Sequence, residues 1–515
     1  MTFSNDDIKQ ITQHGLSPEE VSKQIQMIKK GPTYTSVLAP AKTGDGIIKL
    51  TEKEEKHFLD IFEQQKEQYQ LQKFVPASGA ATRMFKDWVY FYKHYRPGRD
   101  YYERFINKHQ LTNFEPFLDD FLGNFPGFAF YQDLMDVIQK KLPGFFQLDE
   151  NEQAWQLIHF TLSNEGLGYI THPKALIKFH RYHKDDIRTA LDEQVQEALA
   201  YTSTPMQKAH VLFTINPAKQ TDFDAHIQNL SQQLPVKIET TVQKPSTDAV
   251  MLDSENMLVR DEKGQIVFRP GGHGSLIYNL QDLDSDIVFI KNIDNVQKGE
   301  AQNISTRYKK ILAGYLMDLM VQSKKYLTQL RDEKPIHEDL QAIEDFAKNR
   351  LNIHFIEGYD TLNNSGKRKY LAYKINRPLR VAGMVKNTGE PGGGPFWAKD
   401  KNGLKSLQIV EKAQIDTRQP GQAKALSEST HFNPVDLVLS LKDFEGNKFN
   451  LTEYINPEAA IISQKTYGDK PVKIYEHPGL WNGAMDGWNT VFIEVPLETF
   501  SPVKTVTDLL KPEHQ

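Results

Sequence analysis

The chain has 515 residues, of which 39% are hydrophobic, 11% aromatic and 25% charged. A chain of this length can bury a large core, and disordered chains are poorer in aromatic residues, so we expect a large globular domain with additions. The formal net charge of -5 gives no general attraction to nucleic acid or to anionic membranes. We therefore expect neither as a partner, and an anionic ligand would need a local basic cluster.

Cysteine is absent from the sequence. This excludes disulfides, thiolate nucleophiles, cysteine-zinc sites and iron–sulfur clusters, and leaves oxygen and nitrogen as ligand atoms. The N-terminus has no basic start with an apolar run of signal or membrane length, and no such run follows later. These features predict a cytoplasmic protein and leave its oligomeric state open.

Residues 1–70 are predicted to form an N-terminal helical cap. Ser17, Pro18 and Glu20 combine a capping serine, a proline at the first helical position and a glutamate three residues after the cap. A second helix is expected within residues 50–72, where apolar side chains recur at helical spacing.

An α/β domain is predicted for residues 71–420. It begins with a strand at 73–77, the small-residue loop SGAATRM at 78–84 and a helix, an order in which α/β proteins present backbone amides to phosphate. From 87 to about 170 the sequence is aromatic and helical without a strand of parallel-sheet type, which predicts a helical insertion. A strand at 209–217 restores the βαβ alternation.

The later part of the chain continues the α/β pattern. Residues 307–330 form the clearest amphipathic helix, and strands are expected within 371–387 and 406–416. Residues 421–515 are predicted to form a β-rich C-terminal part. The expected fold class is α/β, with a mostly parallel twisted sheet, a helical cap, a helical insertion and this β-rich part.

The loop SGAATRM has two interpretations. As a bare motif it is more often a tight strand-to-helix turn, because small residues are used there for packing as often as for phosphate. In the functional interpretation, the amides of residues 79–82 contact a triphosphate and Arg83 neutralises charge on departing pyrophosphate.

The segment RPGGHG at residues 269–274 follows an apolar strand. Glycines allow a base or ribose to approach the backbone, which would place Gly271, Gly272 and Gly274 against the nucleotide and make His273 a polar contact. The alternative is a hairpin turn with an exposed histidine.

Asp294 follows the apolar run Ile287 to Ile290. A carboxylate beyond the carboxyl end of a strand can hold a divalent cation in an open α/β sheet. The sequence Asn-Ile-Asp-Asn at 292–295 would equally form an ordinary turn, because Asn and Asp hydrogen-bond their own backbone.

RPGGHG, followed by an apolar strand and an Asp-Asn pair, resembles the UDP-sugar pyrophosphorylase-like nucleotidyltransferases. SGAATRM resembles the Gly-x-Gly-Thr-Arg signature of that superfamily, with alanine at 80 or 81 where glycine is usual. Pro173-Lys174 resembles the proline–lysine step that closes the signature. The resemblance implies a nucleotide-diphospho-sugar transferase fold of GT-A-like type, and Mg²⁺ held by Asp294.

The same resemblance implies a set of site residues. Phosphate contact and catalysis would fall to Arg83, Lys174 and Lys465, and nucleotide binding to Ser78, Gly79, Ala80, Ala81, Thr82, Gln243, Gly271, Gly272, His273 and Gly274. The sugar would be contacted by Gly383, Glu390, Glu411, His431 and Asn433.

Several of these residues have structural alternatives. Lys174 and Lys465 could be exposed lysines that contact only water, and Gln243 and Glu411 could be solvated strand residues. His431 and Asn433 could have capping or buried polar roles.

The implied reaction forms a nucleotide sugar from a nucleoside triphosphate, UTP being favoured, and a sugar 1-phosphate, with release of pyrophosphate. Alternatives are a glycosyltransferase of the same fold and a catalytically inactive regulator that binds a nucleotide sugar. RPGGHG, EPGGGPF and PGLWNGAM together also resemble an uncharacterised bacterial domain-of-unknown-function family over nearly the whole chain.

Overall fold

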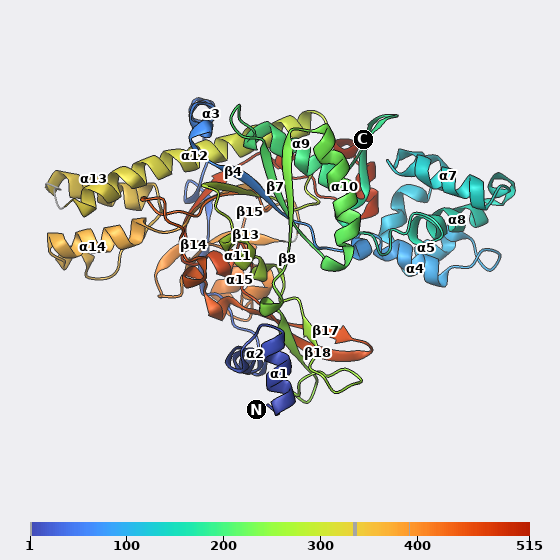
Figure 1. The fold of residues 1–515 in the computed structure, drawn as a ribbon, viewed down its shortest axis with the longest axis horizontal. Coiled ribbons are helices and arrows are strands. Elements are labelled where there is room, and N and C mark those ends of the chain that lie inside the picture. Colours follow the sequence, from blue (N-terminus) through green and yellow to red (C-terminus); the bar gives the residue numbers. More distant parts are fainter. Residues whose placement is uncertain (1–2, 333–336, 391) are drawn as a thin grey trace. The chain divides into compact units, whose positions relative to one another are not determined.

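The computed structural model describes residues 3–332, 337–390 and 392–515 (Figure 1). The chain forms two compact units. Unit 1 comprises residues 1–74, 241–290 and 308–497, and unit 2 comprises residues 75–240, 291–307 and 498–515. Both contain helices and strands, so the protein is of mixed α/β class. No helix in the described ranges is long and apolar enough to cross a membrane.

Unit 1 is built around a large sheet that runs in the order β2-β3-β19-β12-β16-β11-β4. Neighbours pair in parallel at β2/β3, β3/β19, β19/β12 and β11/β4, whereas β16 runs antiparallel to both β11 and β12. The sheet is therefore mostly parallel, as expected. The strands are β2 (Lys42–Thr43), β3 (Gly46–Ile48), β19 (Asn489–Glu494), β12 (Leu379–Lys386), β16 (Leu437–Ser440), β11 (Ile287–Ile290) and β4 (Leu71–Pro76), with β15 (His431–Phe432) paired to β12.

The central strands of this sheet are buried along their whole length. All residues of β11 and β16 are buried, and so are those of β12 from Leu379 to Val385. A continuous apolar run is typical of a strand that is covered on both faces, which explains why these segments lack the alternation of a half-exposed strand.

Two smaller sheets complete the strands of unit 1. One has the order β1-β13-β14 and the other β10-β9-β18-β17. Their strands are β1 (Val37–Pro40), β13 (Gly393–Lys399), β14 (Lys405–Glu411), β10 (Phe268–Arg269), β9 (Ala249–Leu252), β18 (Lys470–Glu476) and β17 (Ile461–Tyr467). The N-terminal helices pack on the second sheet through a core that includes Ile25 and Val250.

Two of the helices expected from the sequence begin at a capping residue. Helix α2 (Pro18–Lys30) has the expected capping box between Ser17 and Glu20, and α3 (Glu52–Gln65) confirms the second predicted helix. Unit 1 also contains α1 (Asn5–Gln13), α11 (Ile277–Gln281), α13 (His337–Asn349), α14 (Asn364–Ile375) and α15 (Pro420–Ser427), together with most of α12 (Glu300–Arg331).

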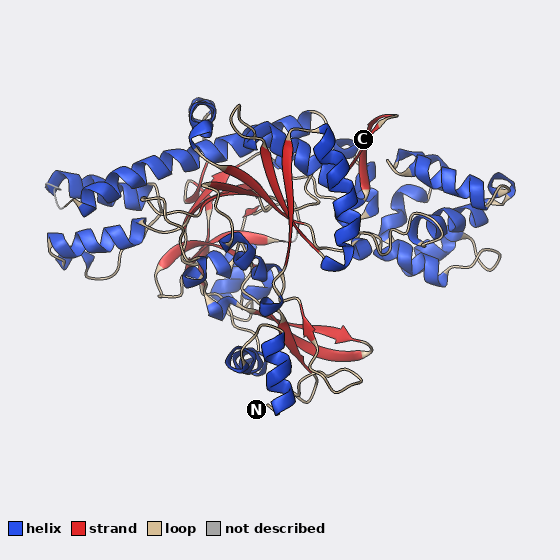
Figure 2. Cartoon of the chain, viewed as in Figure 1, coloured by secondary structure: helices blue, strands red, loops and turns tan. Residues whose placement is uncertain are grey.

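Unit 2 contains the aromatic stretch that the sequence predicts to be helical. Figure 2 shows helices and loops there, and no strand is assigned within residues 87–170. Trp88 packs against the rings of Phe114, Phe117, Phe125 and Phe128. The helices are α4 (Lys86–His94), α5 (Tyr102–His109), α6 (Phe121–Asn124), α7 (Tyr131–Lys141) and α8 (Glu150–Leu162).

The remainder of unit 2 restores the alternation of strands and helices. Its elements are β5 (Lys178–His183), β6 (Asp186–Thr189), α9 (Ala190–Thr202), β7 (Ala209–Ile215), α10 (Gln220–Gln233) and β8 (Val236–Val242), the last two residues of which belong to unit 1. The sequence-based division into residues 1–70, 71–420 and 421–515 stays a prediction.

One predicted strand is shorter than expected. Residues 371–375, at the start of the segment 371–387, belong to helix α14, and the strand begins at Leu379. Asn363 caps this helix by accepting a hydrogen bond from Gly366, so the chain is already helical where the apolar pattern begins.

Candidate functional site

The loop after β4 lies against the Pro173-Lys174 step within unit 2. The amide of Lys174 donates to the carbonyl of Gly79 at 3.3 Å, and the amide of Ala81 donates to the carbonyl of His172 at 3.3 Å. Ala80 and Pro173 form an isolated antiparallel bridge between these contacts. Two segments about 90 residues apart, which resemble the two parts of one signature, are thus neighbours in the fold.

Alanine fits the backbone of this loop. Ala80 is extended, with φ -75° and ψ 154°, and residues 78–84 include no residue with positive φ. A Cβ placed on Gly79 would meet no atom within 4 Å. The replacement of the usual glycine by alanine therefore causes no strain here, because alanine is disfavoured only at positive φ.

Lys174 forms an ion pair with Asp294. The Lys174 Nζ lies 2.7 Å from Asp294 Oδ2, and the two side chains are only 13% and 14% exposed. Lys504 Nζ lies 3.5 Å from the same oxygen. Burial would raise the pKa of Asp294, but the two lysines outweigh it and hold the pKa below its usual range.

Asp294 and its neighbours offer Mg²⁺ a single carboxylate ligand. Asp294 is a single carboxylate with two lysines around it, and no group of three or more His, Asp or Glu able to hold a metal occurs in the described ranges. Mg²⁺ can bind through one carboxylate when substrate phosphates and water supply the other ligands. The cluster thus fits a cation that arrives with a phosphate ligand, and does not fit a site made of protein ligands alone.

Residues 292–295 form the turn that the alternative interpretation predicts. The amide of Asn295 donates to the carbonyl of Asn292 at 3.2 Å, and Gln194 Nε2 donates to that carbonyl at 2.8 Å. The carbonyl of Asp294 accepts from the amide of Val503 at 3.0 Å. The turn is therefore held through its backbone groups, and its hydrogen bonds do not use the Asp294 carboxylate.

The RPGGHG loop lies in unit 1, and its glycines are required by contacts within the chain. A Cβ on Gly271 would lie 2.4 Å from the His477 ring, and a Cβ on Gly274 would lie 2.2 Å from the carbonyl oxygen of Pro478. Gly272 has φ +80°, and its carbonyl accepts from Gln243 Nε2 at 3.1 Å. The segment 476–478 thus packs against these glycines, where the sequence predicts contact with a nucleotide. Nucleotide contact there stays a prediction.

His273 is held on several sides by the segment 479–482. The amide of Leu480 donates to His273 Nδ1 at 3.1 Å, so the ring proton is on Nε2 in the neutral form. The imidazole stacks on Trp481 at 4.2 Å between centroids, and a Cβ on Gly479 would lie 2.6 Å from the ring. The orientation of His273 is therefore fixed by the protein.

Glu411 is the acidic neighbour of this histidine. Its Oε1 lies 3.7 Å from His273 Nε2 and accepts a hydrogen bond from Asn482 Nδ2 at 2.9 Å. Contact with His273, supported by Asn482, holds the pKa of Glu411 below its usual range although burial opposes this shift. The structure thus brings Gln243, the glycine loop, His273 and Glu411 into one group.

The other residues predicted for the sugar are placed separately. Asn433 Nδ2 donates to the carbonyl of Gly383 at 3.0 Å, and both residues are buried. His431 is 3% exposed and lies 3.5 Å from Glu494, and burial lowers its pKa. Glu390 is exposed in the loop after β12.

The two remaining cations differ in their contacts. Lys465 pairs with Glu476 at 2.6 Å, whereas Arg83 is exposed and takes part in none of the ion pairs found in the described ranges. Arg83 is therefore available to an anionic ligand without losing a partner.

Three residues that the sequence analysis did not select take part in these groups. Lys504 lies beside Asp294, and Trp481 and Asn482 position His273 and Glu411. The segment PGLWNGAM was noted only for its family resemblance. Lys504 gives no such signal.

The predicted site residues of this α/β protein thus include a cluster around Lys174 and Asp294 and a cluster around His273 and Glu411. The chain belongs to the family described as a domain of unknown function, DUF4301, whose family model matches residues 4–515. This confirms the resemblance to an uncharacterised family. No curated protein matches the chain.

Among solved structures, the chain is similar to UDP-sugar pyrophosphorylases. The UDP-glucose phosphorylase of Trypanosoma brucei matches at 12% identity and a TM-score of 0.46, over 98% of this chain and 76% of that chain. A mutant UDP-glucose pyrophosphorylase of Leishmania major with UDP-glucose matches at 12% identity and a TM-score of 0.43, over 99% and 79%.

The uridine diphosphate N-acetylglucosamine pyrophosphorylase of Trypanosoma brucei, in complex with an inhibitor, also matches at 12% identity and a TM-score of 0.46, over 98% and 76%.

Proposed function

We propose that the chain is a sugar-phosphate nucleotidyltransferase of GT-A-like fold, which forms a nucleotide sugar from UTP and a sugar 1-phosphate. The observation that supports this proposal best is the cluster in unit 2. The loop 78–83 and Lys174 resemble the two parts of one signature, and Asp294 resembles the magnesium aspartate of the same superfamily. The three are neighbours although the sequence separates them widely.

In the proposed reaction, an oxygen of the sugar 1-phosphate attacks the α-phosphorus of UTP. The bond from this phosphorus to the oxygen bridging to the β-phosphate breaks, and pyrophosphate leaves with the electron pair. The attacking phosphate has a second pKa near ~6, so it is ionised at neutral pH and needs little help from a general base.

The chain's own residues would neutralise and position phosphate. Lys174 is oriented by Asp294, and Arg83 is exposed without an ion-pair partner in the described ranges. When bound with the triphosphate, Mg²⁺ would neutralise phosphate oxygens near Asp294. In unit 1, taken by itself, His273 can donate its fixed Nε2 proton to a polar ligand group.

The first experiment measures pyrophosphate release from UTP with a panel of sugar 1-phosphates and Mg²⁺. Lys174→Ala should lower kcat/KM by about 100-fold, because loss of one preorganised charge contact costs about 2.7 kcal/mol in the transition state. Arg83→Ala should lower it as well. Lys184→Ala is the matched control, because Lys184 is an exposed lysine of the same unit.

Equal activity of Lys174→Ala and Lys184→Ala would remove Lys174 from the phosphate role. Saturable binding of a nucleotide sugar by the wild type without any turnover would support the inactive regulator instead. Consumption of a nucleotide sugar without dependence on pyrophosphate would support the glycosyltransferase.

A further inference from the structure

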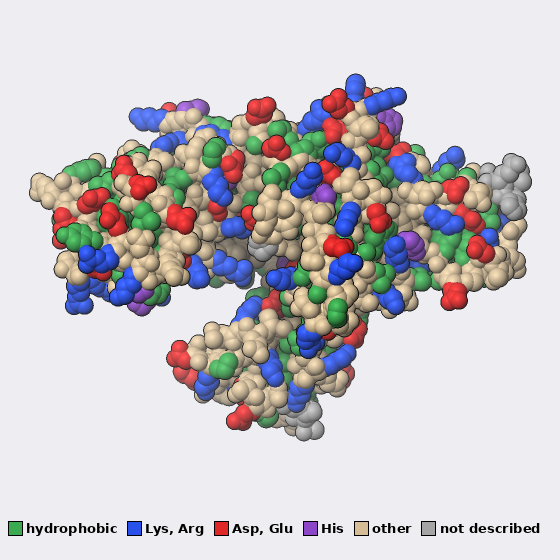
Figure 3. All heavy atoms as spheres, turned by 180° about the vertical axis from the view of Figure 1, so that it is seen from behind, with side chains coloured by type: hydrophobic (Ala, Val, Ile, Leu, Met, Phe, Trp, Pro, Cys, Tyr) green, Lys and Arg blue, Asp and Glu red, His purple; other side chains and the backbone are tan. Residues whose placement is uncertain are grey.

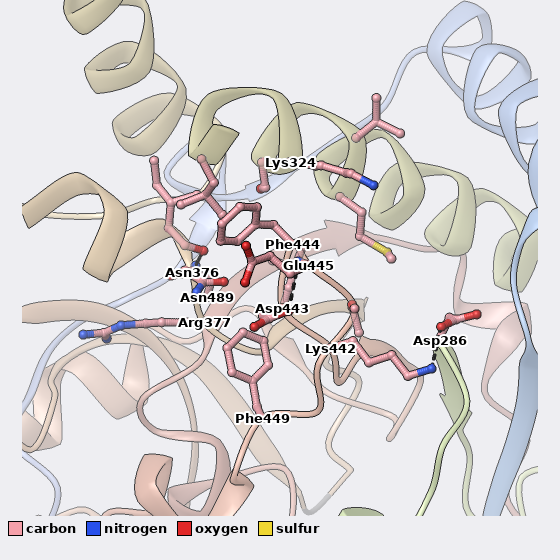
Figure 4. A pocket seen from close by; sticks show the side chains of 18 of the residues that line it. Asp286, Lys324, Asn376, Arg377, Lys442, Asp443, Phe444, Glu445, Phe449 and Asn489 are labelled. Carbon is pink, nitrogen blue, oxygen red and sulfur yellow. Dashed lines mark hydrogen bonds and ion pairs between the residues drawn. The ribbon is translucent and has the colours of Figure 1, made fainter. Parts of the chain in front are cut away.

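A cavity of about 290 Å³ opens in unit 1 at the edge of the large sheet where the parallel strands begin (Figure 4). The pairing register places Leu71, Ile287, Ser440, Leu379 and Asn489 in one row across five adjacent strands. Gly383 and Asn433 lie toward the opposite end of β12, so the cavity is distinct from the residues proposed to contact the sugar.

The walls of the cavity are aromatic and aliphatic. Phe444 and Phe449 come from the loop that follows β16, Val321 and Leu327 from α12, and Ile375 from the end of α14. The loop is fixed, because Gln281 Nε2 donates to the carbonyl of Phe449 at 3.0 Å and Asp443 Oδ1 accepts the amides of Glu445 and Asn447. Apolar, largely preformed walls favour a flat ligand.

Two amide side chains line one part of the cavity. Asn489 is 6% exposed, and its Nδ2 donates to the carbonyls of Lys374 and Ile375, each at 3.1 Å, so its orientation is fixed. The side-chain amide of Asn376 lies next to it in Figure 4 and makes no hydrogen bond within the described part of the chain. Together they offer donors and an oriented acceptor to the polar edge of a ring.

Some charged side chains at the cavity form ion pairs within the chain, and others do not. Asp286 pairs with Lys442 at 2.8 Å, and Glu445 pairs with Arg331 at 3.1 Å. The Asp443 carboxylate accepts a hydrogen bond from a backbone amide of its own turn. The guanidinium of Arg377 lies over the Tyr373 ring at 4.6 Å. Lys324 is exposed and, among the ion pairs of the described residues, it has none. Its charge remains for an acidic group of the ligand.

We propose that this cavity binds a flat heterocycle that has an amide-like edge and carries one acidic group. The ring lies against Phe444 and Phe449, the amide-like edge meets Asn376 and Asn489, and the acidic group meets Lys324. This binding activity is separate from nucleotidyl transfer, because no residue of the two clusters described above lines the cavity.

The test uses pterin-6-carboxylate, a fluorescent ring of this kind, in an anisotropy titration without UTP or sugar phosphate. The wild type should bind at one saturable site. Lys324→Gln should weaken binding about fivefold to tenfold and leave binding of unsubstituted pterin unchanged, because that probe lacks the acidic group. Asn376→Ala should weaken both probes, and Lys325→Gln, an exposed neighbour on the same helix, should weaken neither.

Melting temperatures equal to that of the wild type establish that the variants are folded. The absence of saturable binding up to about 1 mM probe overturns the proposal, because a Kd above that value means that the cavity does not recognise the ring. Equal binding by Lys324→Gln and Lys325→Gln overturns it too, and so does equal binding by Asn376→Ala and the wild type.

Discussion

The pair of Lys174 and Asp294 is the residue-scale feature with the clearest physical consequence. Both side chains are largely removed from water and their charged atoms are 2.7 Å apart. Removal of Asp294 leaves the buried charge of Lys174 without its carboxylate partner, which costs more than the pair contributes, whereas removal of Lys174 leaves Asp294 with Lys504 at 3.5 Å. The functional and the structural role of Asp294 must therefore be measured together.

Asp294→Asn should weaken the dependence of turnover on Mg²⁺ and also lower the free energy of unfolding by about 3 kcal/mol. Lys174→Met should cost less, because Lys504 still lies 3.5 Å from Asp294, and the double variant should cost less than the sum, because it removes both charges of the pair. Magnesium titrations of pyrophosphate release and urea unfolding of the variants provide both measurements. Additive free energies would show that the ion pair does not couple the two residues.

Asp486 supplies a prediction on pH. It is 6% exposed, and burial raises its pKa to about 6, although the amide of Lys401 donates to it at 3.0 Å. The folded protein therefore prefers the protonated acid. Stability is unaffected well below pH ~4, falls as pH rises toward ~6 and stays reduced above that value.

The variant Asp486→Asn lacks this titration. The stability of the wild type relative to the variant should therefore fall by up to about 3 kcal/mol between pH ~4 and ~7. Urea unfolding at a series of pH values checks this difference. A difference that does not change with pH would contradict a buried protonated carboxyl.

At the scale of elements, the two glycine loops have different physical reasons for their glycines. The loop after β4 has open space around Gly79, whereas Gly274 lies directly against the backbone of residues 477–478. A matched pair of alanine substitutions therefore separates a loop that is free to contact a ligand from a loop that packs on its own chain.

Gly79→Ala should leave stability unchanged or raise it by about 0.5 kcal/mol, and should weaken UTP binding if phosphate approaches this amide. Gly274→Ala should lower stability by about 2 kcal/mol or more, because its Cβ would lie 2.2 Å from a carbonyl oxygen. Thermal unfolding and calorimetric titration with UTP measure the two effects. Comparable stability of both variants would mean that the backbone at Gly274 relaxes freely.

Sequence reasoning was effective for local features and weak for contacts between remote segments. The capping box of α2 and the loop after β4 are local, and both were predictable from residue type and spacing. The contact of Lys174 with Asp294 joins residues 120 positions apart, and one sequence holds no signal for it. The role of Gly271 and Gly274 was also hidden, because the segment that packs on them follows some 200 residues later.

At the scale of the whole molecule, the chain combines a mixed surface with two compact units. Acidic and basic side chains are interspersed over the face drawn in Figure 3, in keeping with a formal net charge of only -5. Each unit has its own buried residues, such as Val288 in unit 1 and Trp88 in unit 2. Proteins of this kind commonly depart from a single all-or-none transition.

Calorimetric unfolding should therefore show a total enthalpy greater than the van't Hoff enthalpy derived from the shape of the transition. Differential scanning calorimetry measures both quantities in one experiment, provided that unfolding is reversible. A ratio of one would show that the two units unfold as one cooperative unit.

The order of strands in the large sheet of unit 1 also bears on how the chain is synthesised. The strand β11 pairs with β4, made about 210 residues earlier, and with β16, made about 150 residues later. One edge of the buried strand β12 stays unpaired until β19, which ends at Glu494, has been synthesised. A growing chain thus carries unpaired apolar strand edges at least until residue 494 has been made, and such edges are prone to pair with other chains. Expression yield should accordingly depend on chaperone supply and on slow translation at low temperature.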